Sequence, residues 1–148
     1  MVEREAETLI LHELGEAMAE PLLGGAWREL VASFTGRRAE ILARAVRDNL
    51  ADCLSTLPCL IERDTAGSIH FFFANFEGMR SKLFPLLAQA YRAWRESGSL
   101  APMREAARAG SAHWHEAALR LLRLHQSDPA TAEETIAAWI EDPAALAL

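Results

Sequence analysis

Histidine is the residue type in this chain best suited to binding a metal or moving a proton near neutral pH. The five histidines are His12, His70, His113, His115 and His125. The closest pair, His113 and His115, flanks Trp114. Residues two apart on a regular helix point about 200° away from each other, so a shared metal would require a break in the helix near Gly110. We therefore interpret them as surface or partly buried histidines with local hydrogen bonds.

His12 and Glu16 are four residues apart, a spacing that places two side chains on the same face of a helix. One such pair supplies only two ligands. The chain contains no Glu-x-x-His pair of the kind found in di-iron helical bundles, and no His-Glu-x-x-His zinc motif. The sequence indicates no metal ligand and no catalytic residue, and the cofactor, if there is one, is unknown. A metal or haem protein using His113 or His115 stays as an alternative.

Arg108 and His113 have the Arg-x4-His spacing and resemble the motif of HEPN-type ribonucleases, small helical proteins that dimerise. The resemblance implies that the pair would act on the 2′-hydroxyl and phosphate of RNA. Ala109 stands where that motif usually has a polar residue, and Arg120 with His125 repeats the spacing. A HEPN-like ribonuclease is the second enzymatic alternative for this chain.

The chain has 148 residues, of which 51% are hydrophobic and 24% charged, a balance typical of one globular domain. No apolar run approaches the roughly 20 residues that span a bilayer. The acidic N-terminal segment also lacks the basic start of a signal peptide. We expect a cytoplasmic domain with no membrane partner. Cys53 and Cys59 are expected to be free thiols, with a disulfide between them as the alternative.

The net charge of −6 is unevenly distributed along the chain. Residues 1–20 carry six acids and one base, residues 127–148 carry five acids and no base, and residues 21–126 carry an excess of four bases. Nucleic-acid binding requires clustered bases that neutralise phosphates, so we expect no nucleic-acid partner. The acidic ends are expected to cover the basic middle, within one molecule or across a homodimer.

Apolar residues recur at helical spacing almost throughout, and no segment of any length alternates with the period of two that strands show. We therefore predict an all-α fold, a single domain over residues 1–148 built as a bundle of five to seven helices. The predicted helices cover residues 3–19, 27–34, 37–56, 68–97 and 101–126, with a last one starting at Asp128 or Thr131 and ending at Asp142. In the first helix, the stripe predicted to face the core is Ile10, Leu14, Ala17 and Met18.

Proline and glycine mark the expected ends of these helices. Proline interrupts helical hydrogen bonding, and glycine adopts the left-handed conformation that often follows a helix. The expected breaks lie at Pro21 with Gly24-Gly25, at Pro58, near residues 81–84 before Pro85, and at Gly98.

The segment His70–Phe76, HFFFANF, holds four of the six phenylalanines in the chain. On a helical wheel Phe72, Phe73 and Phe76 share a core-facing stripe, whereas Phe71 points to the far side. Phe71 is expected to be covered by another helix of the chain, by a second copy in a homodimer, or by an apolar small ligand. The candidate ligand- or partner-binding residues are His70, Phe71, Phe73, Trp94, Trp114 and His113.

Residues 68–77, SIHFFFANFE, resemble the end of the recognition helix of TetR-type repressors, and residues 37–42, RRAEIL, resemble the first helix of that family. The resemblance implies a dimeric, ligand-sensing regulator. The spacing departs from the family, since several residues are missing where a helix-turn-helix needs its turn and recognition helix. Phe76 also stands where a lysine is common, and these departures leave DNA reading in doubt.

These observations favour a non-enzymatic helical binding or regulatory module. It would act as a homodimer through a hydrophobic surface or pocket around residues 69–83, toward a protein partner or an apolar small ligand. The alternatives are the HEPN-like ribonuclease or His-based metal or haem protein, and a degenerate TetR-like regulator.

Overall fold

The computed structural model describes the backbone of residues 2–148 and the side chains of residues 6–148. All regular secondary structure in this range is helical, which confirms the predicted all-α class. No helix among the described residues combines the length and the apolar composition needed to cross a membrane.

The chain forms helices of very different lengths. In chain order they are α1 (Val2–Ser33), α2 (Arg37–Ala51), a π-helical turn (Asp52–Thr56), α3 (Leu57–Arg63), α4 (Ala66–Ala74), α5 (Gly78–Leu83), α6 (Pro85–Ser97), α7 (Ala101–Ser127), α8 (Pro129–Ala138) and a 3-10 turn (Pro143–Ala145). The backbone stays helical through both ends of the π-helical turn, so α2, this turn and α3 form one continuous helix. Counted in this way, residues 2–148 form seven helices, within the predicted range.

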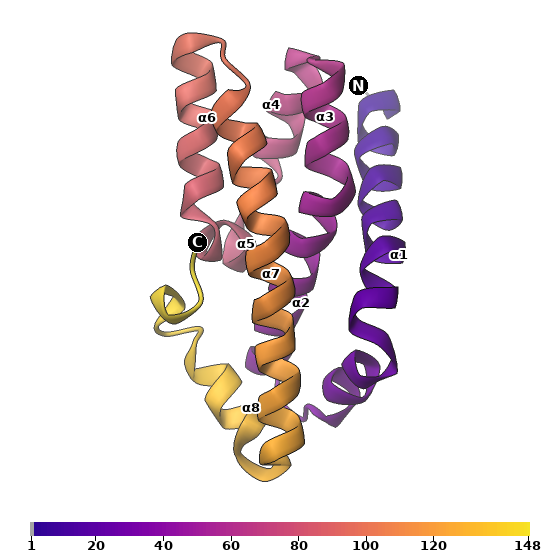
Figure 1. The fold of residues 1–148 in the computed structure, drawn as a ribbon, viewed down its shortest axis with the longest axis vertical. Coiled ribbons are helices and arrows are strands. Elements are labelled where there is room, and N and C mark those ends of the chain that lie inside the picture. Colours follow the sequence, from indigo (N-terminus) through magenta and orange to yellow (C-terminus); the bar gives the residue numbers. More distant parts are fainter. Residues whose placement is uncertain (1) are drawn as a thin grey trace.

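The two central helices of the bundle are α2 and α7. In Figure 1, α7 runs down the front of the bundle, with α6 on one side and α1 at the opposite edge. The helix α2 contacts α1, α7 and α8, and α7 also contacts α6. Their facing side chains are fully buried, among them Leu42, Val46, Leu50, Trp114 and Leu121. Each such side chain contributes about 1.5–3 kcal/mol through burial.

The predicted core face of the first helix is wrong. Ile10, Leu14 and Met18 are 66%, 52% and 44% exposed, and the opposite face of α1 packs against α2 and the π-helical turn. The reason is a close approach of two backbones at Gly15. A Cβ atom on Gly15 would lie 2.2 Å from the carbonyl oxygen of Ala51, so only the face that carries glycine can make this contact.

The first helix also extends past its predicted end at Pro21. The chain kinks at Gly24, whose φ of 65° and ψ of −165° are not helical, and then continues in helical form to Ser33. Beyond the kink, Trp27 and Leu30 are buried in the core. The two helices predicted over residues 3–19 and 27–34 therefore adjoin without a loop.

The helix predicted to stop at Pro58 continues through the π-helical turn. Proline lacks an N–H group and normally interrupts helical bonding. A π-helical turn shifts the bonding pattern by one residue, and here it precedes Pro58, which becomes the second residue of α3. The same turn supplies Asp52 to one pocket of the bundle and Cys53 to another.

The predicted helix over residues 68–97 is divided into α4, α5 and α6. The break at Leu83–Pro85 was expected, whereas the break at Asn75–Glu77 was not. The side-chain amide of Asn75 donates a hydrogen bond of 2.8 Å to the carbonyl oxygen of Phe71, which satisfies an acceptor at the end of α4. Gly98 follows α6 with a φ of 74°, as predicted for this position.

The C-terminal tail is docked on the bundle. The N–H group of Leu148 donates to the carbonyl oxygen of Leu83, and the carbonyl oxygen of Leu148 accepts from the N–H group of Leu86, both at 2.9 Å. The last helix starts at Pro129, after Asp128, which is the first of the two predicted starts.

Acidic side chains from both ends of the chain pair with bases of the middle segment. Glu7 of α1 forms an ion pair with Arg63, and Glu141 forms one with Arg38. Part of the predicted charge compensation therefore takes place within one molecule.

Candidate functional site

The aromatic side chains singled out by the sequence do not form one site. His70, Phe73 and Trp94 lie together where α4 meets α6. The Nδ1 atom of His70 lies 2.7 Å from the hydroxyl oxygen of Tyr91, and the His70 and Trp94 ring centroids are 5.1 Å apart. Phe73 stacks on Tyr91 at 4.0 Å. These contacts hold α4 against α6; Phe73 is half-buried by them, whereas His70 stays exposed.

The other candidates lie elsewhere. Phe71 is half-buried and lines a separate pocket described below. Trp114 is fully buried against Phe84, with ring centroids 5.3 Å apart. The Nε2 atom of His113 lies 2.7 Å from the carbonyl oxygen of Leu146, so His113 contacts the C-terminal tail. His113 is partly buried, as expected, but its hydrogen bond is to a residue 33 positions away in the chain and not to a local group.

A buried charge cluster, which the sequence did not reveal, surrounds Asp52 in the π-helical turn. The Asp52 side chain is only 3% exposed. Its carboxylate accepts hydrogen bonds from the Thr56 hydroxyl at 3.0 Å and from Nδ1 of His12 at 2.9 Å, and it forms an ion pair with Arg80. Three elements, α1, the π-helical turn and α5, thus meet at one carboxylate. A buried carboxylate needs such partners, since an isolated buried charge is strongly unfavourable.

His12 is electrostatically coupled to this carboxylate. Its hydrogen bond to Asp52 is the main cause that raises the pKa of His12 above the ordinary value of 6.5. Partial burial opposes the rise, whereas the negative charges of Asp52 and Asp48 add to it. The protonated imidazole is therefore stabilised in the folded protein.

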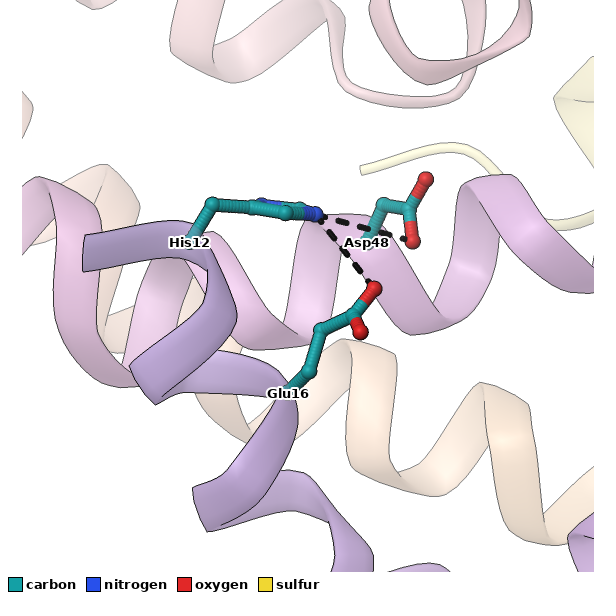
Figure 2. Close-up of side chains that lie close together, drawn as sticks. All are labelled: His12, Glu16 and Asp48. Atoms are coloured by element: carbon teal, nitrogen blue, oxygen red, sulfur yellow. Dashed lines mark ion pairs between the residues drawn. The ribbon is translucent and has the colours of Figure 1, made fainter. Parts of the chain in front are cut away.

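A second layer of charge lies beyond the His12 ring. The Nε2 atom of His12 is 3.5 Å from Oε1 of Glu16 and 3.9 Å from Oδ1 of Asp48. Figure 2 shows the ring directed toward both carboxylates, one from α1 and one from α2. Arg47 donates to the same two oxygens, at 2.5 Å to Glu16 and 3.3 Å to Asp48. The pair His12 and Glu16, which share one face of α1, is thus joined by Asp48 of α2, a residue 32 positions after Glu16 in the chain.

A small pocket of about 280 Å³ lies next to the charge cluster. It combines the ionic groups with one wall of aromatic rings from α4. The hydroxyl oxygen of Thr8 is buried and has no hydrogen-bond partner among the residues that the structure describes. The lining residues are Thr8, Leu9, His12, Asp52, Phe71, Phe72, Asn75 and Arg80. This arrangement gives Phe71 a position beside polar groups rather than in the apolar core.

A larger cavity of about 730 Å³ lies between α1, α3 and α7 and includes the opposite side of the π-helical turn. Its walls are mainly apolar and its rim carries bases. Arg108, which the sequence paired with His113, lies on this rim and pairs with Glu105 at 2.6 Å. The main lining residues are Leu22, Leu54, Pro58, Ile61, Ala107 and Ala112, with Arg104, Arg108 and His115 beside them.

Cys53 lines this cavity as a free thiol, and Cys59 is free as well, as predicted. Cys53 is 4% exposed. Burial, with the nearby negative charge of Asp52 as a smaller cause, raises the pKa of the Cys53 thiol far above its ordinary range. The thiol is therefore neutral at physiological pH and a poor nucleophile.

An exposed apolar row extends along α1 toward the cavity. We call it the α1 ridge; its residues are spaced by four and lie on one face of the helix. Large apolar side chains this exposed in a contiguous row often mark an interaction surface. The residues of the α1 ridge are Ile10, Leu14, Met18 and Leu22, exposed by 66%, 52%, 44% and 43%.

Comparison with known proteins places the chain in a family. Residues 1–143 match the family model described as the C-terminal domain of a family of unknown function, DUF6866. The chain belongs to this family. No curated protein and no solved structure matches the DUF6866 domain significantly.

The charge cluster had no recognisable signal in the sequence. On a helical wheel Asp52 lies off the apolar stripe of Leu50, Cys53 and Leu57, on a side of the helix that is usually exposed to solvent. Spacing could not name its partners either, because His12 and Arg80 are 40 and 28 residues away.

Proposed function

We propose that this domain is a non-enzymatic helical binding module that works as a homodimer. In the dimer, the α1 ridge of each copy packs into the apolar cavity of the other. The observation that carries the proposal is the α1 ridge itself, whose side chains are 43–66% exposed and which leads into an apolar cavity of about 730 Å³. Both surfaces lose unfavourable contact with water when they meet.

Charge complementarity supports a second copy as the occupant. By sequence, residues 1–20 carry a net charge of −5, and among the described residues of α1 the exposed Glu13 lies beside the ridge. The cavity lining carries two arginines, Arg104 and Arg108, against one acid, Glu62. Packing α1 against the cavity of another copy brings acids to bases, whereas pairing two α1 helices directly would bring acids to acids. Such matching favours the correct partner and speeds encounter.

The position of Leu22 supports a symmetric arrangement. Leu22 belongs to the α1 ridge and also lines the cavity, so the two surfaces adjoin on one side of the molecule. A two-fold axis near Leu22 would make both contacts at once, each ridge entering the opposite cavity, as in an isologous dimer.

The proposed surface differs from the one expected around residues 69–83. In that segment Phe72 and Phe76 are buried, and Phe73 stacks on Tyr91 within the same chain. The most exposed large apolar side chains lie on α1 instead.

Sedimentation velocity across a concentration series tests the proposal. We expect the wild type to dimerise, and Leu14→Glu to be monomeric because it places a charge in the apolar contact. Ala112→Trp, on the exposed face of α7 within the cavity, should also be monomeric because its ring occupies the space that the ridge needs. Ile41→Glu is the matched control, since Ile41 is 43% exposed but lies on α2.

The result that contradicts the proposal is a wild type that stays monomeric up to about 100 µM, or a Leu14→Glu variant that still dimerises. Native mass spectrometry of the purified wild type adds an independent readout. A monomer that retains an apolar small molecule would assign the cavity to that ligand and would exclude the dimer contact.

A further inference from the structure

His12, Glu16 and Asp48 form a half-buried group at the interface of α1 and α2. Their side chains are 21%, 28% and 23% exposed. One ligand atom from each residue lies within 4.8 Å of the others. Ligand atoms around a tetrahedral zinc ion with bonds of about 2.1 Å are about 3.4 Å apart. The 3.5 Å between Nε2 of His12 and Oε1 of Glu16 is close to this value.

The orientation of the His12 ring is the second observation that points to a metal. Nδ1 lies 2.9 Å from the Asp52 carboxylate, which can only accept a hydrogen bond when ionised. Nδ1 therefore carries a proton in either charge state of the ring, and when the ring is neutral the lone pair of Nε2 faces Glu16 and Asp48. Metal-binding histidines are held in this way by a carboxylate on the far side of the ring.

Asp52 is itself held rigidly in that supporting position. Its carboxylate is 3% exposed and is bonded to Thr56 at 3.0 Å and to Arg80. This arrangement fixes the plane of the His12 ring before any ion binds. It also gives a role to the π-helical turn, since π-helical turns often serve to position a functional residue.

The formal charges around His12 favour the binding of a cation. Glu16, Asp48 and Asp52 contribute three negative charges, and Arg47 and Arg80 contribute two positive ones. With His12 neutral, the group carries one net negative charge. A proton on Nε2 or a metal ion can compensate it, and the two would compete for the same atom.

We propose that His12, Glu16 and Asp48 bind a divalent first-row transition metal such as Zn²⁺, with Asp52 as the outer-shell carboxylate behind His12. One imidazole and two carboxylates suit zinc and its neighbours, whereas Mg²⁺ and Ca²⁺ prefer oxygen ligands alone. Three protein ligands leave the remaining positions to water. The proposal is independent of the dimer described above.

Arg47 would compete with a metal ion for the carboxylates of Glu16 and Asp48. Its guanidinium group donates to Oε1 of Glu16 and Oδ1 of Asp48, the same oxygens that face His12. The Arg47 side chain is 34% exposed, so it can withdraw toward solvent when a metal takes its place. Removing this group should therefore strengthen metal binding.

Titration of tag-free protein with Co²⁺, followed by its visible absorption, and with Zn²⁺, followed by calorimetry, tests the site. We expect one ion per chain. Glu16→Gln and Asp48→Asn should each weaken binding by about tenfold or more, while Arg47→Gln should strengthen it. His125→Gln, which changes a half-buried histidine outside the group and outside both pockets, is the matched control and should bind as the wild type does.

His12→Gln should abolish binding, but His12 also contacts buried Asp52, so its fold must be checked by circular dichroism. The ion pairs of Glu16 and Asp48 are with His12 and Arg47, so Glu16→Gln and Asp48→Asn keep the test valid if that variant unfolds. The proposal is overturned if the wild type binds neither ion at millimolar concentration, or if Glu16→Gln and Asp48→Asn bind as tightly as the wild type.

Discussion

The missing side chain of Gly15 brings α1 into backbone contact with the end of α2: a Cβ atom at Gly15 would lie 2.2 Å from the carbonyl oxygen of Ala51. Because of this contact, the face of α1 that carries the small residues Gly15 and Ala19 points inward, and the α1 ridge is exposed to solvent. It also positions His12, one turn earlier, beside the π-helical turn.

Gly15→Ala should therefore destabilise the fold, although alanine is the better helix former. The backbone of Ala51 cannot yield as a flexible side chain would, so we expect a loss of about 1–3 kcal/mol, the usual cost of overpacking. Chemical denaturation followed by circular dichroism measures it. Gly25→Ala is the control, because the nearest atom to its Cβ is an Arg28 nitrogen at 3.8 Å. Equal stability of both variants would contradict the contact.

Asp52→Ala should be among the most damaging substitutions in the domain. It leaves Arg80 and His12 beside a site that has lost its carboxylate, and breaking a buried ion pair from one side costs about 3–5 kcal/mol. Urea denaturation measures the change. The double variant Asp52→Ala with Arg80→Met should recover part of the loss, since it removes the unpaired charge. Additive losses in the double variant would show that the pair is not coupled.

The stability of the domain should depend on pH through His12. Because the folded-state pKa of His12 is raised, this group contributes its full stabilisation below the unfolded value of about 6.5. That contribution is lost as pH rises through the folded pKa. The free energy of unfolding should therefore fall above about pH 6.5, measured with a chelator present to exclude metal.

His12→Gln provides the reference for this pH dependence, since the difference between wild type and variant isolates the titration of one group. NMR titration of the His12 ring should give a pKa above 6.5, and Asp52→Asn should lower it. A His12 pKa at or below the ordinary value would show that the Asp52 hydrogen bond does not form in solution.

The two thiols should differ sharply in reactivity. Cys53 is buried with a raised pKa, whereas Cys59 is half-exposed. An aromatic disulfide reagent at pH 8 should modify the Cys59 thiol rapidly. It should modify the Cys53 thiol only after denaturant is added. In Cys59→Ser the rapid phase should disappear. Two rapid equivalents in the wild type would contradict the packing of Cys53 against the cavity wall.

Local patterns anticipated much of the backbone and little of the site. The break before Pro85 and the end of α6 at Gly98 followed from the chemistry of those two residues, which acts within a few positions of the chain. The break at Asn75 escaped prediction, because it depends on a side-chain bond to Phe71 that the apolar pattern of HFFFANF conceals. The apolar pattern of α1 predicts the wrong inward face, because hydrophobicity does not record the close approach of the Gly15 and Ala51 backbones.

The amino-acid sequence by itself determined the all-α class, several helix ends such as those at Pro85 and Gly98, and the free state of the two thiols, since these depend on propensity, periodicity and composition along the chain. Only the tertiary structure decided which face of α1 is buried, where the apolar cavity lies, and that His12 meets Asp52, Asp48 and Glu16. The physical reason is distance along the chain. His12 and Asp52 are 40 residues apart, and a contact of that range depends on how whole helices pack, which no local spacing encodes.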